Sequence, residues 1–307
     1  MRSYADAHCD TLTKLADAGE HLWQNKGHLD LMRLCRYKTA VQVFAIWLNK
    51  MYYQNATQKT LSYLTYFERE LAKNQDLIAL VKNYDDILQN KKQGKCSAIL
   101  AIEGGEALEG QISTLQMYYE KGVRMMTLTW NYPNALGDGV DGFGGLTLFG
   151  KSVVKEMYDI GIVVDVSHLA EKGFYDVADF GLPFIASHSN ARQICSHKRN
   201  LTKQQLKIVK ENDGFVGVNF YADFLTDNGK ATIDDVLRHI WYLLDMAGEC
   251  HVGFGSDFDG ITKMPQNLNG VEDMAILLEI LEKEFGKELT EKIAEQNFLA
   301  MLQRVWK

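Results

Sequence analysis

Proline is scarce in this sequence, and the features that mark unfolded or cross-linked chains are missing. Only 3 of the 307 residues are proline, while 46% are hydrophobic and 24% are charged. This balance excludes a disordered, collagen-like or low-complexity chain. The cysteines never stand in a C-x-x-C spacing; they are Cys9, Cys35, Cys96, Cys195 and Cys250. Their odd number and wide spread argue against a disulfide framework or a structural zinc knuckle and favour a reducing compartment.

Long apolar runs and an excess of positive charge are also missing. The sequence has no apolar run long enough to span a membrane, and residues 1–6 are not followed by the apolar core and cleavage site of a signal peptide. We therefore expect a cytoplasmic protein without a membrane partner. Lys and Arg number 33 against 40 for Asp and Glu, which gives a net charge of −7. This charge offers no basic footprint for nucleic acid and favours a small-molecule partner.

Eight short apolar or β-branched runs recur along the chain, and segments with helical spacing separate them. The runs cover residues 4–9, 40–48, 97–102, 125–129, 162–166, 184–187, 215–219 and 251–255. Apolar residues at three- and four-residue spacing predict amphipathic helices over residues 61–71, 112–119, 150–160, 203–210 and 233–247. Eight strands that alternate with helices predict an α/β fold, the TIM-type (β/α)8 barrel.

The chain shows no sign of a division into parts. It contains no linker rich in Pro, Gly and Ser and no internal repeat, so we expect a single domain over residues 1–307. An open doubly wound sheet is the alternative fold. That fold would need a phosphate-binding G-x-G-x-x-G turn after the first strand, whereas the first run here ends in His8-Cys9-Asp10.

Side chains suited to metal chemistry stand at the ends of several predicted strands. They are His8, Asp10, Glu103, His168, His188 and Asp257. In a (β/α)8 barrel the carboxyl ends of the strands meet at one face, so these residues are expected to lie together. His8 and Asp10 are two apart and leave an extended segment on the same side. Glu103 could share its two oxygens between two ions, which gives five ligands for two metals.

Each of these residues also has a simpler explanation. A single histidine among apolar neighbours is more often a hydrogen-bonded core residue than a ligand. Asp10 could cap a helix that begins near residue 11, and Glu103, before two glycines, could be a turn residue. Asp165 could orient His168 or could instead be a buried carboxylate bonded to backbone amides. The remaining histidines, His21, His28, His197, His239 and His251, are expected to be solvated or structural.

Taken together, the ordered motifs resemble the zinc dipeptidases of the renal, or membrane, dipeptidase family, which are amidohydrolase-like barrels. The resemblance covers nearly the whole chain. Its motifs lie at residues 6–10, 101–105, 127–129, 165–168, 187–189, 199–200, 218–221 and 253–260. It implies two Zn²⁺ ions per chain and a dipeptide substrate.

The resemblance also implies a role for each matching position. His8 and Asp10 match the ligands of one zinc, His168 and His188 match those of the other, and Glu103 matches the bridging carboxylate. Asp257 matches the acid/base residue, and Arg199 and Tyr221 match groups around the substrate carboxylate. The implied nucleophile is a hydroxide that bridges the metals. Tolerance of a D-residue at the carboxyl end and a homodimer are also implied.

One position departs from the family. Where the family has a histidine after Leu-Thr-Leu-Thr, this chain has Trp130, whose indole cannot titrate near neutrality. We expect Trp130 to shape the pocket and Asn131 to offer the hydrogen bond to the substrate.

Two other functions remain open. Another amidohydrolase-type enzyme, such as an amidase, a deacetylase or a lactonase, would share the His-x-Asp pair, but many of these use a bridging Lys after the fourth strand. No Lys ends the run 125–129 here. A non-catalytic peptide-binding barrel would be expected to have lost ligands.

Overall fold

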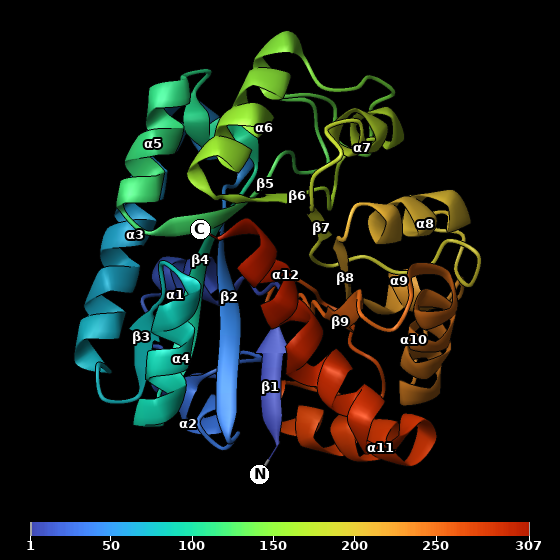
Figure 1. Ribbon diagram of the computed structural model, residues 1–307. Helices are drawn as coiled ribbons and strands as arrows, with labels where there is room; N and C mark the ends of the chain where they lie inside the picture. The colour runs from blue at the N-terminus through green and yellow to red at the C-terminus, as the bar shows by residue number, and fades with distance from the viewer. Residues whose placement is uncertain (1, 307) are drawn as a thin grey trace.

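Eight parallel strands close into a barrel in the computed structural model, which describes residues 2–306 (Figure 1). The strands are β1 (Ser3–Asp6), β2 (Thr39–Trp47), β4 (Cys96–Glu103), β5 (Val123–Thr127), β6 (Val163–Asp165), β7 (Ile185–Ala186), β8 (Phe215–Val218) and β9 (Val252–Phe254). Neighbours pair in chain order, β9 pairs with β1, and the pairing of β2 with β4 completes the ring. Each predicted run overlaps one of these strands, and the (β/α)8 prediction is confirmed.

A further short strand, β3 (Ile78–Leu80), lies outside the ring. It pairs with the first residues of β4, from Ile78 with Cys96 to Leu80 with Ala98. β5 joins β4 only from Leu100 onward. The sequence prediction missed β3 because three residues are too few to show a period.

Helices surround the barrel, and the five predicted ones are all present. They are α3 (Ala56–Lys73), α5 (Ile112–Glu120), α6 (Leu148–Ile160), α8 (Lys203–Glu211) and α10 (Ile233–Ala247). Those not predicted are α1 (Thr11–Ala18), α2 (Leu31–Leu34), α4 (Tyr84–Gln93), α7 (Glu171–Ala178), α9 (Ala222–Leu225), α11 (Met274–Glu291) and α12 (Asn297–Val305). Local side-chain hydrogen bonds set the ends of some helices. Thr202 and Gln205, for example, form a capping box at the start of α8.

Alternation along the strands separates two apolar layers. In β4, Ile99 and Ala101 face the barrel interior, whereas Leu100 and Ile102 pack outward against the helices. The same alternation turns Glu103, at the end of β4, toward the interior. The interior therefore changes from apolar to charged at the carboxyl end of this strand.

Helix α12 covers the opposite end of the barrel, where the strands begin. The Phe298 ring lies 5.2 Å from the ring of Phe215, the first residue of β8. Asn297 donates a hydrogen bond of 2.8 Å to the carbonyl of Val252, the first residue of β9. Leu302 and Trp306 complete the apolar cluster that fills this end. One end of the barrel is thus closed, and only the carboxyl end is open for a site.

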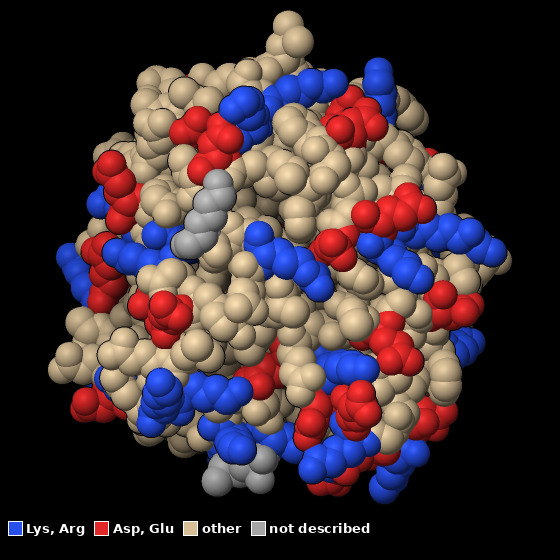
Figure 2. Space-filling model, in the orientation of Figure 1, with Lys and Arg blue, Asp and Glu red and all other residues tan. Residues whose placement is uncertain are grey.

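The surface is mixed in charge on the side that faces the viewer in Figure 1. Figure 2 shows basic and acidic side chains interspersed over this face. Within residues 2–306, no helix combines the length and the apolar character needed to cross a bilayer.

Candidate active site

The five side chains predicted as metal ligands converge at the carboxyl ends of the strands. His8 and Asp10 follow β1, Glu103 ends β4, His168 follows β6 and His188 follows β7. Each has 9% or less of its surface exposed. The fold therefore brings together, from four strands, the residues that the sequence placed together.

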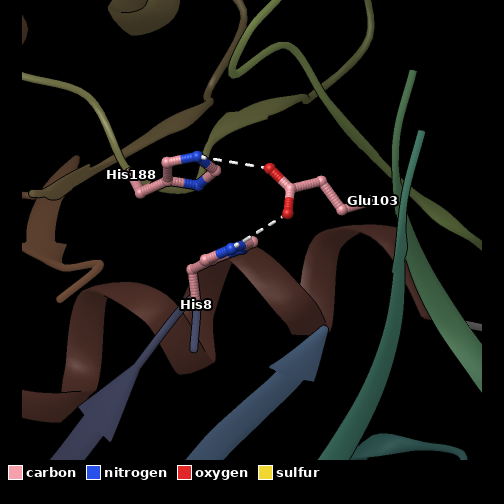
Figure 3. A group of neighbouring side chains, drawn as sticks. All are labelled: His8, Glu103 and His188. Atoms are coloured by element: carbon pink, nitrogen blue, oxygen red, sulfur yellow. Dashed lines mark ion pairs between the residues drawn. The ribbon is translucent and has the colours of Figure 1, made fainter. Parts of the chain in front are cut away.

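Glu103 lies between two groups of these side chains, and each carboxylate oxygen faces a different group. Oε1 lies 3.0 Å from His168 Nε2 and 3.7 Å from His188 Nε2. Oε2 lies 3.6 Å from His8 Nε2, and Figure 3 shows the two oxygens directed toward His188 and His8. The two oxygens of Glu103 could therefore contact two different cations.

The group around His8 consists of carboxylates. His8 Nε2 lies 3.5 Å from Asp10 Oδ2 and 4.0 Å from Asp257 Oδ1. One ligand atom from each of these three residues lies within 4.8 Å of the others. Asp10 is the residue before α1, but its side chain accepts no capping hydrogen bond from the described backbone. Helix capping thus does not explain its burial.

The second group is a pair of imidazoles. His168 Nε2 and His188 Nε2 lie 2.8 Å apart and face Glu103. The other ring nitrogen of each histidine has a hydrogen-bond partner. His168 Nδ1 lies 2.7 Å from Asn131 Oδ1, and His188 Nδ1 lies 2.7 Å from Ser187 Oγ. Such partners fix the orientation of an imidazole that binds a metal.

Of the two roles predicted for Asp165, the structure supports that of a buried carboxylate bonded to backbone amides. Its Oδ1 accepts hydrogen bonds from the backbone amides of Ser167 and Ser187, and its Oδ2 accepts from the hydroxyls of Thr127 and Ser187. The partner of His168 is Asn131 instead. Asp165 therefore ties together three strand ends beneath the site.

Burial and neighbouring charges shift the pKa values of the three carboxylates in different directions. Burial opposes the ionisation of Glu103, but the charge of His8 and hydrogen bonding from His168 outweigh it, so the pKa of Glu103 lies well below its usual range. Burial, despite the nearby charge of His8, raises the pKa of Asp257 to about 8, and the Asp10 and Glu103 carboxylates add to the shift. Burial and the Glu103 charge also raise the pKa of Asp10. The charge of His8 therefore does not offset the burial and mutual repulsion of Asp10 and Asp257.

The two facing histidines are held in the neutral form. Burial, reinforced by the charge of Arg199, lowers the pKa of His168 to about 4. Burial and the charge of His8 lower the pKa of His188 well below its usual value. Neutral imidazoles have a free lone pair, which is the form that binds a metal ion.

Two residues of the site have a left-handed backbone conformation. His168 has φ 66° and Asp257 has φ 63°, although both carry side chains. Non-glycine residues in this region cost about 1–3 kcal/mol each and gather at functional sites. Gly260 approaches the site closely, because a Cβ there would collide with Asp10 Oδ2 and Asp257 Oδ1.

Buried polar atoms without a hydrogen-bond partner in residues 2–306 include Asp10 Oδ1, His8 Nδ1 and Arg199 Nε. Such atoms cost about 1–3 kcal/mol each when they stay unpaired. Oxygen donors around His8 and nitrogen donors around His188, joined by Glu103, are ligands that Zn²⁺ accepts. The donor set therefore fits a pair of divalent cations.

A cleft of about 480 Å³ opens onto these groups, a size typical of small-molecule sites. Its lining contains these predicted residues: Asp10, Glu103, Trp130, Asn131, His168, Tyr221 and Asp257. Arg199 is not in this lining. Its side chain is buried, and its Nη2 donates a hydrogen bond of 3.3 Å to the carbonyl oxygen of His188.

Three residues of the site escaped the sequence analysis. Asn219 donates a hydrogen bond of 2.8 Å from Nδ2 to Asp257 Oδ2. Trp47, the last residue of β2, lines the cleft, and Gly260 leaves room for two carboxylates. Asn219 directly follows a predicted strand, and that position was the available signal. Trp47 lay within a predicted strand, where the inward side could not be read.

A model of the membrane dipeptidase family, peptidase family M19, matches residues 2–307. An uncharacterized dipeptidase of Schizosaccharomyces pombe is 33% identical over 305 residues, which cover 91% of this chain and 72% of that protein. A dipeptidase of Claviceps purpurea is 29% identical, with 91% of this chain and 69% of that protein covered.

Solved structures agree with these sequence matches. A metallopeptidase of family M19, named dipeptidase AC, superposes with a TM-score of 0.93 at 30% identity, and 99% of each chain is covered. A metallopeptidase of Rhodobacter sphaeroides, bound to a phosphinate mimic of L-Ala-D-Ala, gives 0.92 at 28% identity, again over 99% of each chain. The resemblance inferred from the motifs is confirmed: this chain belongs to the membrane dipeptidase family, peptidase family M19, and is a dipeptidase of the metallopeptidase type.

Proposed function

We propose that this chain is a binuclear zinc dipeptidase in which Glu103 bridges the two ions. The observation that carries the proposal is the direction of the two Glu103 oxygens, one toward His168 and His188 and the other toward His8. His8 and Asp10 would hold one ion, and His168 and His188 the other. When bound, the two ions would polarise the scissile carbonyl and supply a bridging hydroxide nucleophile at neutral pH.

Asp257 would act as the proton carrier of the reaction. Asn219 donates a hydrogen bond to its Oδ2, while Oδ1 lies on the side of His8. Asp257 Oδ1 would take the proton of the nucleophile and return it to the departing amine. A proton carrier works best when its pKa is near the operating pH, and burial raises the pKa of this carboxyl to about 8.

Arg199 would limit the substrate to two residues. Arg199 is 5% exposed, and its Nε has no hydrogen-bond partner among residues 2–306. Burial lowers its pKa to about 10, which leaves it charged at neutral pH. A buried, charged guanidinium is suited to a carboxylate, and Tyr221 in the cleft would support the same group. A free carboxyl terminus would therefore be held one residue beyond the scissile bond.

Trp130 would shape the pocket, and Asn131 would contribute through His168 as well as through its own amide. The Rhodobacter sphaeroides relative was solved with a mimic of L-Ala-D-Ala, so we also propose that this chain tolerates a D-residue at the carboxyl side. The single domain over residues 1–307, the homodimer and the cytoplasmic location stay predictions from the sequence.

The decisive experiment combines metal analysis of the purified protein with hydrolysis of L,L and L,D dipeptides, with and without a chelator. We expect about two zinc ions per chain and cleavage that stops with the chelator and returns with zinc. Blocked dipeptides with an amidated carboxyl terminus should be poor substrates. Cleavage that survives complete removal of metal, or hydrolysis of amides and lactones in preference to dipeptides, would contradict the proposal.

A further inference from the structure

Three aromatic side chains pack against one another beside the cleft. The Trp47 and Trp130 rings lie 5.3 Å apart with an interplanar angle of 60°, and the Trp130 and Tyr132 rings lie 5.3 Å apart at 67°. Trp47 and Trp130 both line the cleft and are partly buried. We call Trp47, Trp130 and Tyr132 the aromatic wall. No role in the proposed chemistry uses the two indoles together.

The barrel order places this wall away from the carboxylate-binding groups. Trp47 ends β2 and pairs in register with Glu103 in β4, and Trp130 follows β5. Arg199 follows β7 and Tyr221 follows β8. In the ring β1, β2, β4, β5, β6, β7, β8, β9, strand β2 lies across from β7, and β6 and β7 lie between β5 and β8. A dipeptide held by its carboxylate at Arg199 would therefore direct its amino-terminal residue toward the wall.

The chemistry of the wall favours an uncharged side chain. Lys50 Nζ already lies over the Tyr132 ring, 5.0 Å from its centroid, so one cation is present at the edge of the wall. On the inner side, Glu103 pairs with Trp47 in register, and its carboxylate would disfavour an acidic side chain. Two indoles at edge-to-face distance offer the apolar contact surface that an aromatic or large aliphatic group prefers.

Resting on the dipeptidase function proposed above, we propose that the aromatic wall is the binding site for the amino-terminal side chain of the substrate. It selects dipeptides whose first residue is aromatic or large and aliphatic. Burying a side chain of that size is worth about 1.5–3 kcal/mol, which corresponds to roughly ten- to hundredfold in kcat/KM.

The test compares Phe-Ala, Leu-Ala, Gly-Ala, Lys-Ala and Glu-Ala with the zinc-loaded enzyme. We expect kcat/KM for Phe-Ala and Leu-Ala to exceed that for Gly-Ala by roughly tenfold or more. Trp47→Ala and Trp130→Ala should each reduce the ratio of Phe-Ala to Gly-Ala by roughly tenfold. Trp241→Ala is the matched control, because Trp241 is 50% exposed on α10, and the ratio should not change. Equal rates for Phe-Ala and Gly-Ala, or a preference for Lys-Ala, would overturn the proposal.

A binding measurement separates this inference from the proposed function. Calorimetry with zinc-loaded Asp257→Asn protein gives the Kd of Phe-Ala and Gly-Ala without turnover. Tighter binding of Phe-Ala that is lost in the double variants with Trp47→Ala or Trp130→Ala would support the wall even if the wild type cleaved no dipeptide. Equal Kd values for the two dipeptides would reject the wall while active hydrolysis left the dipeptidase function standing.

Discussion

The two ends of the barrel are built from the same strands but differ in nearly every physical property. At the end covered by α12, Phe298, Leu302 and the first strand residues form an apolar cluster. At the other end, Asp10 Oδ1 and His8 Nδ1 are buried without partners among the described residues, and His168 has a strained backbone. The first end is filled by apolar side chains, although Trp306 Nε1 there also has no partner among the described residues, and the second end holds the buried carboxylates and imidazoles that could bind cations.

The difference teaches where stability and function reside in this chain. A buried carboxylate cluster destabilises a protein unless a cation compensates it. The apolar end contributes ordinary burial, which stabilises the fold at any metal concentration. Substitutions at the carboxyl end should therefore change the chemistry, and substitutions at the α12 end should change the free energy of unfolding.

The largest expected effect is on catalysis at the open end. Asp257→Asn removes the proton carrier while the hydrogen-bonding shape of the side chain is kept, so kcat should fall by about 10³-fold. Zinc content, measured by atomic absorption, should stay the same. The exposed Asp76→Asn is the matched control and should keep its kcat. A variant at position 257 with normal kcat would remove Asp257 from the mechanism.

The next effect concerns the closed end. Phe298→Ala deletes a ring with 2% exposure and should lower the free energy of unfolding by about 3–5 kcal/mol. Urea unfolding of the zinc-loaded protein measures this change, and kcat/KM should stay near the wild-type value below the transition. Phe143→Ala, at a ring with 96% exposure, should change stability by less than about 0.5 kcal/mol. A large loss of kcat/KM in folded Phe298→Ala protein would break the division between the two ends.

The third effect is on the pH dependence of stability and concerns His239, a buried histidine outside the site whose two ring nitrogens both have hydrogen-bond partners. His239 Nδ1 accepts from the Ala191 amide at 3.1 Å, and Nε2 donates to the Leu225 carbonyl at 3.1 Å. Burial lowers the pKa of His239 to about 4, from the ordinary histidine value of about 6.5. Between these pH values the unfolded chain binds a proton that the folded chain does not, so stability falls as the pH falls, by about 3 kcal/mol in total.

His239→Gln should remove this contribution. Urea unfolding between pH 7 and pH 4.5 should show a shallower loss of stability in the variant than in the wild type, after correction for any loss already present at pH 7. Parallel pH profiles for the two proteins would mean that His239 does not hold its proton-free form in the folded state.

The smallest effect concerns substrate affinity. Arg199→Lys keeps the charge but loses the planar pair of donors, so KM for dipeptides should rise roughly ten- to hundredfold with a smaller change in kcat. Arg238→Lys is the matched control, since Arg238 pairs with Asp235 on the exposed face of α10, and its KM should not change. Steady-state kinetics on one good dipeptide substrate measures both constants. An unchanged KM in Arg199→Lys would count against a carboxylate contact.

Much of this arrangement could be predicted because a residue at the end of a predicted parallel strand must lie at the carboxyl face of the barrel. His8, Glu103 and His188 each stand within or just after a short apolar run, and parallel strands bring such positions to one face. The barrel also followed from the number of runs. The three-residue β3 was too short to detect, and α12 lacked any pattern that could reveal its place beneath the barrel.

Contacts between loops that are distant in the sequence could not be predicted. Asn219 reaches Asp257 and Asn131 reaches His168 only because the loops after four strands fold over the same opening. The choice between two roles for Asp165 depended on which backbone amides came within reach. Such side-chain partners are set by tertiary geometry, which residue spacing does not encode.

The most direct test of the account is a crystal structure of the zinc-loaded protein with anomalous data collected at the zinc edge. The account predicts two anomalous peaks per chain about 3.5–4 Å apart, with one Glu103 oxygen on each. A single peak, or two peaks with Glu103 bound to neither, would contradict it.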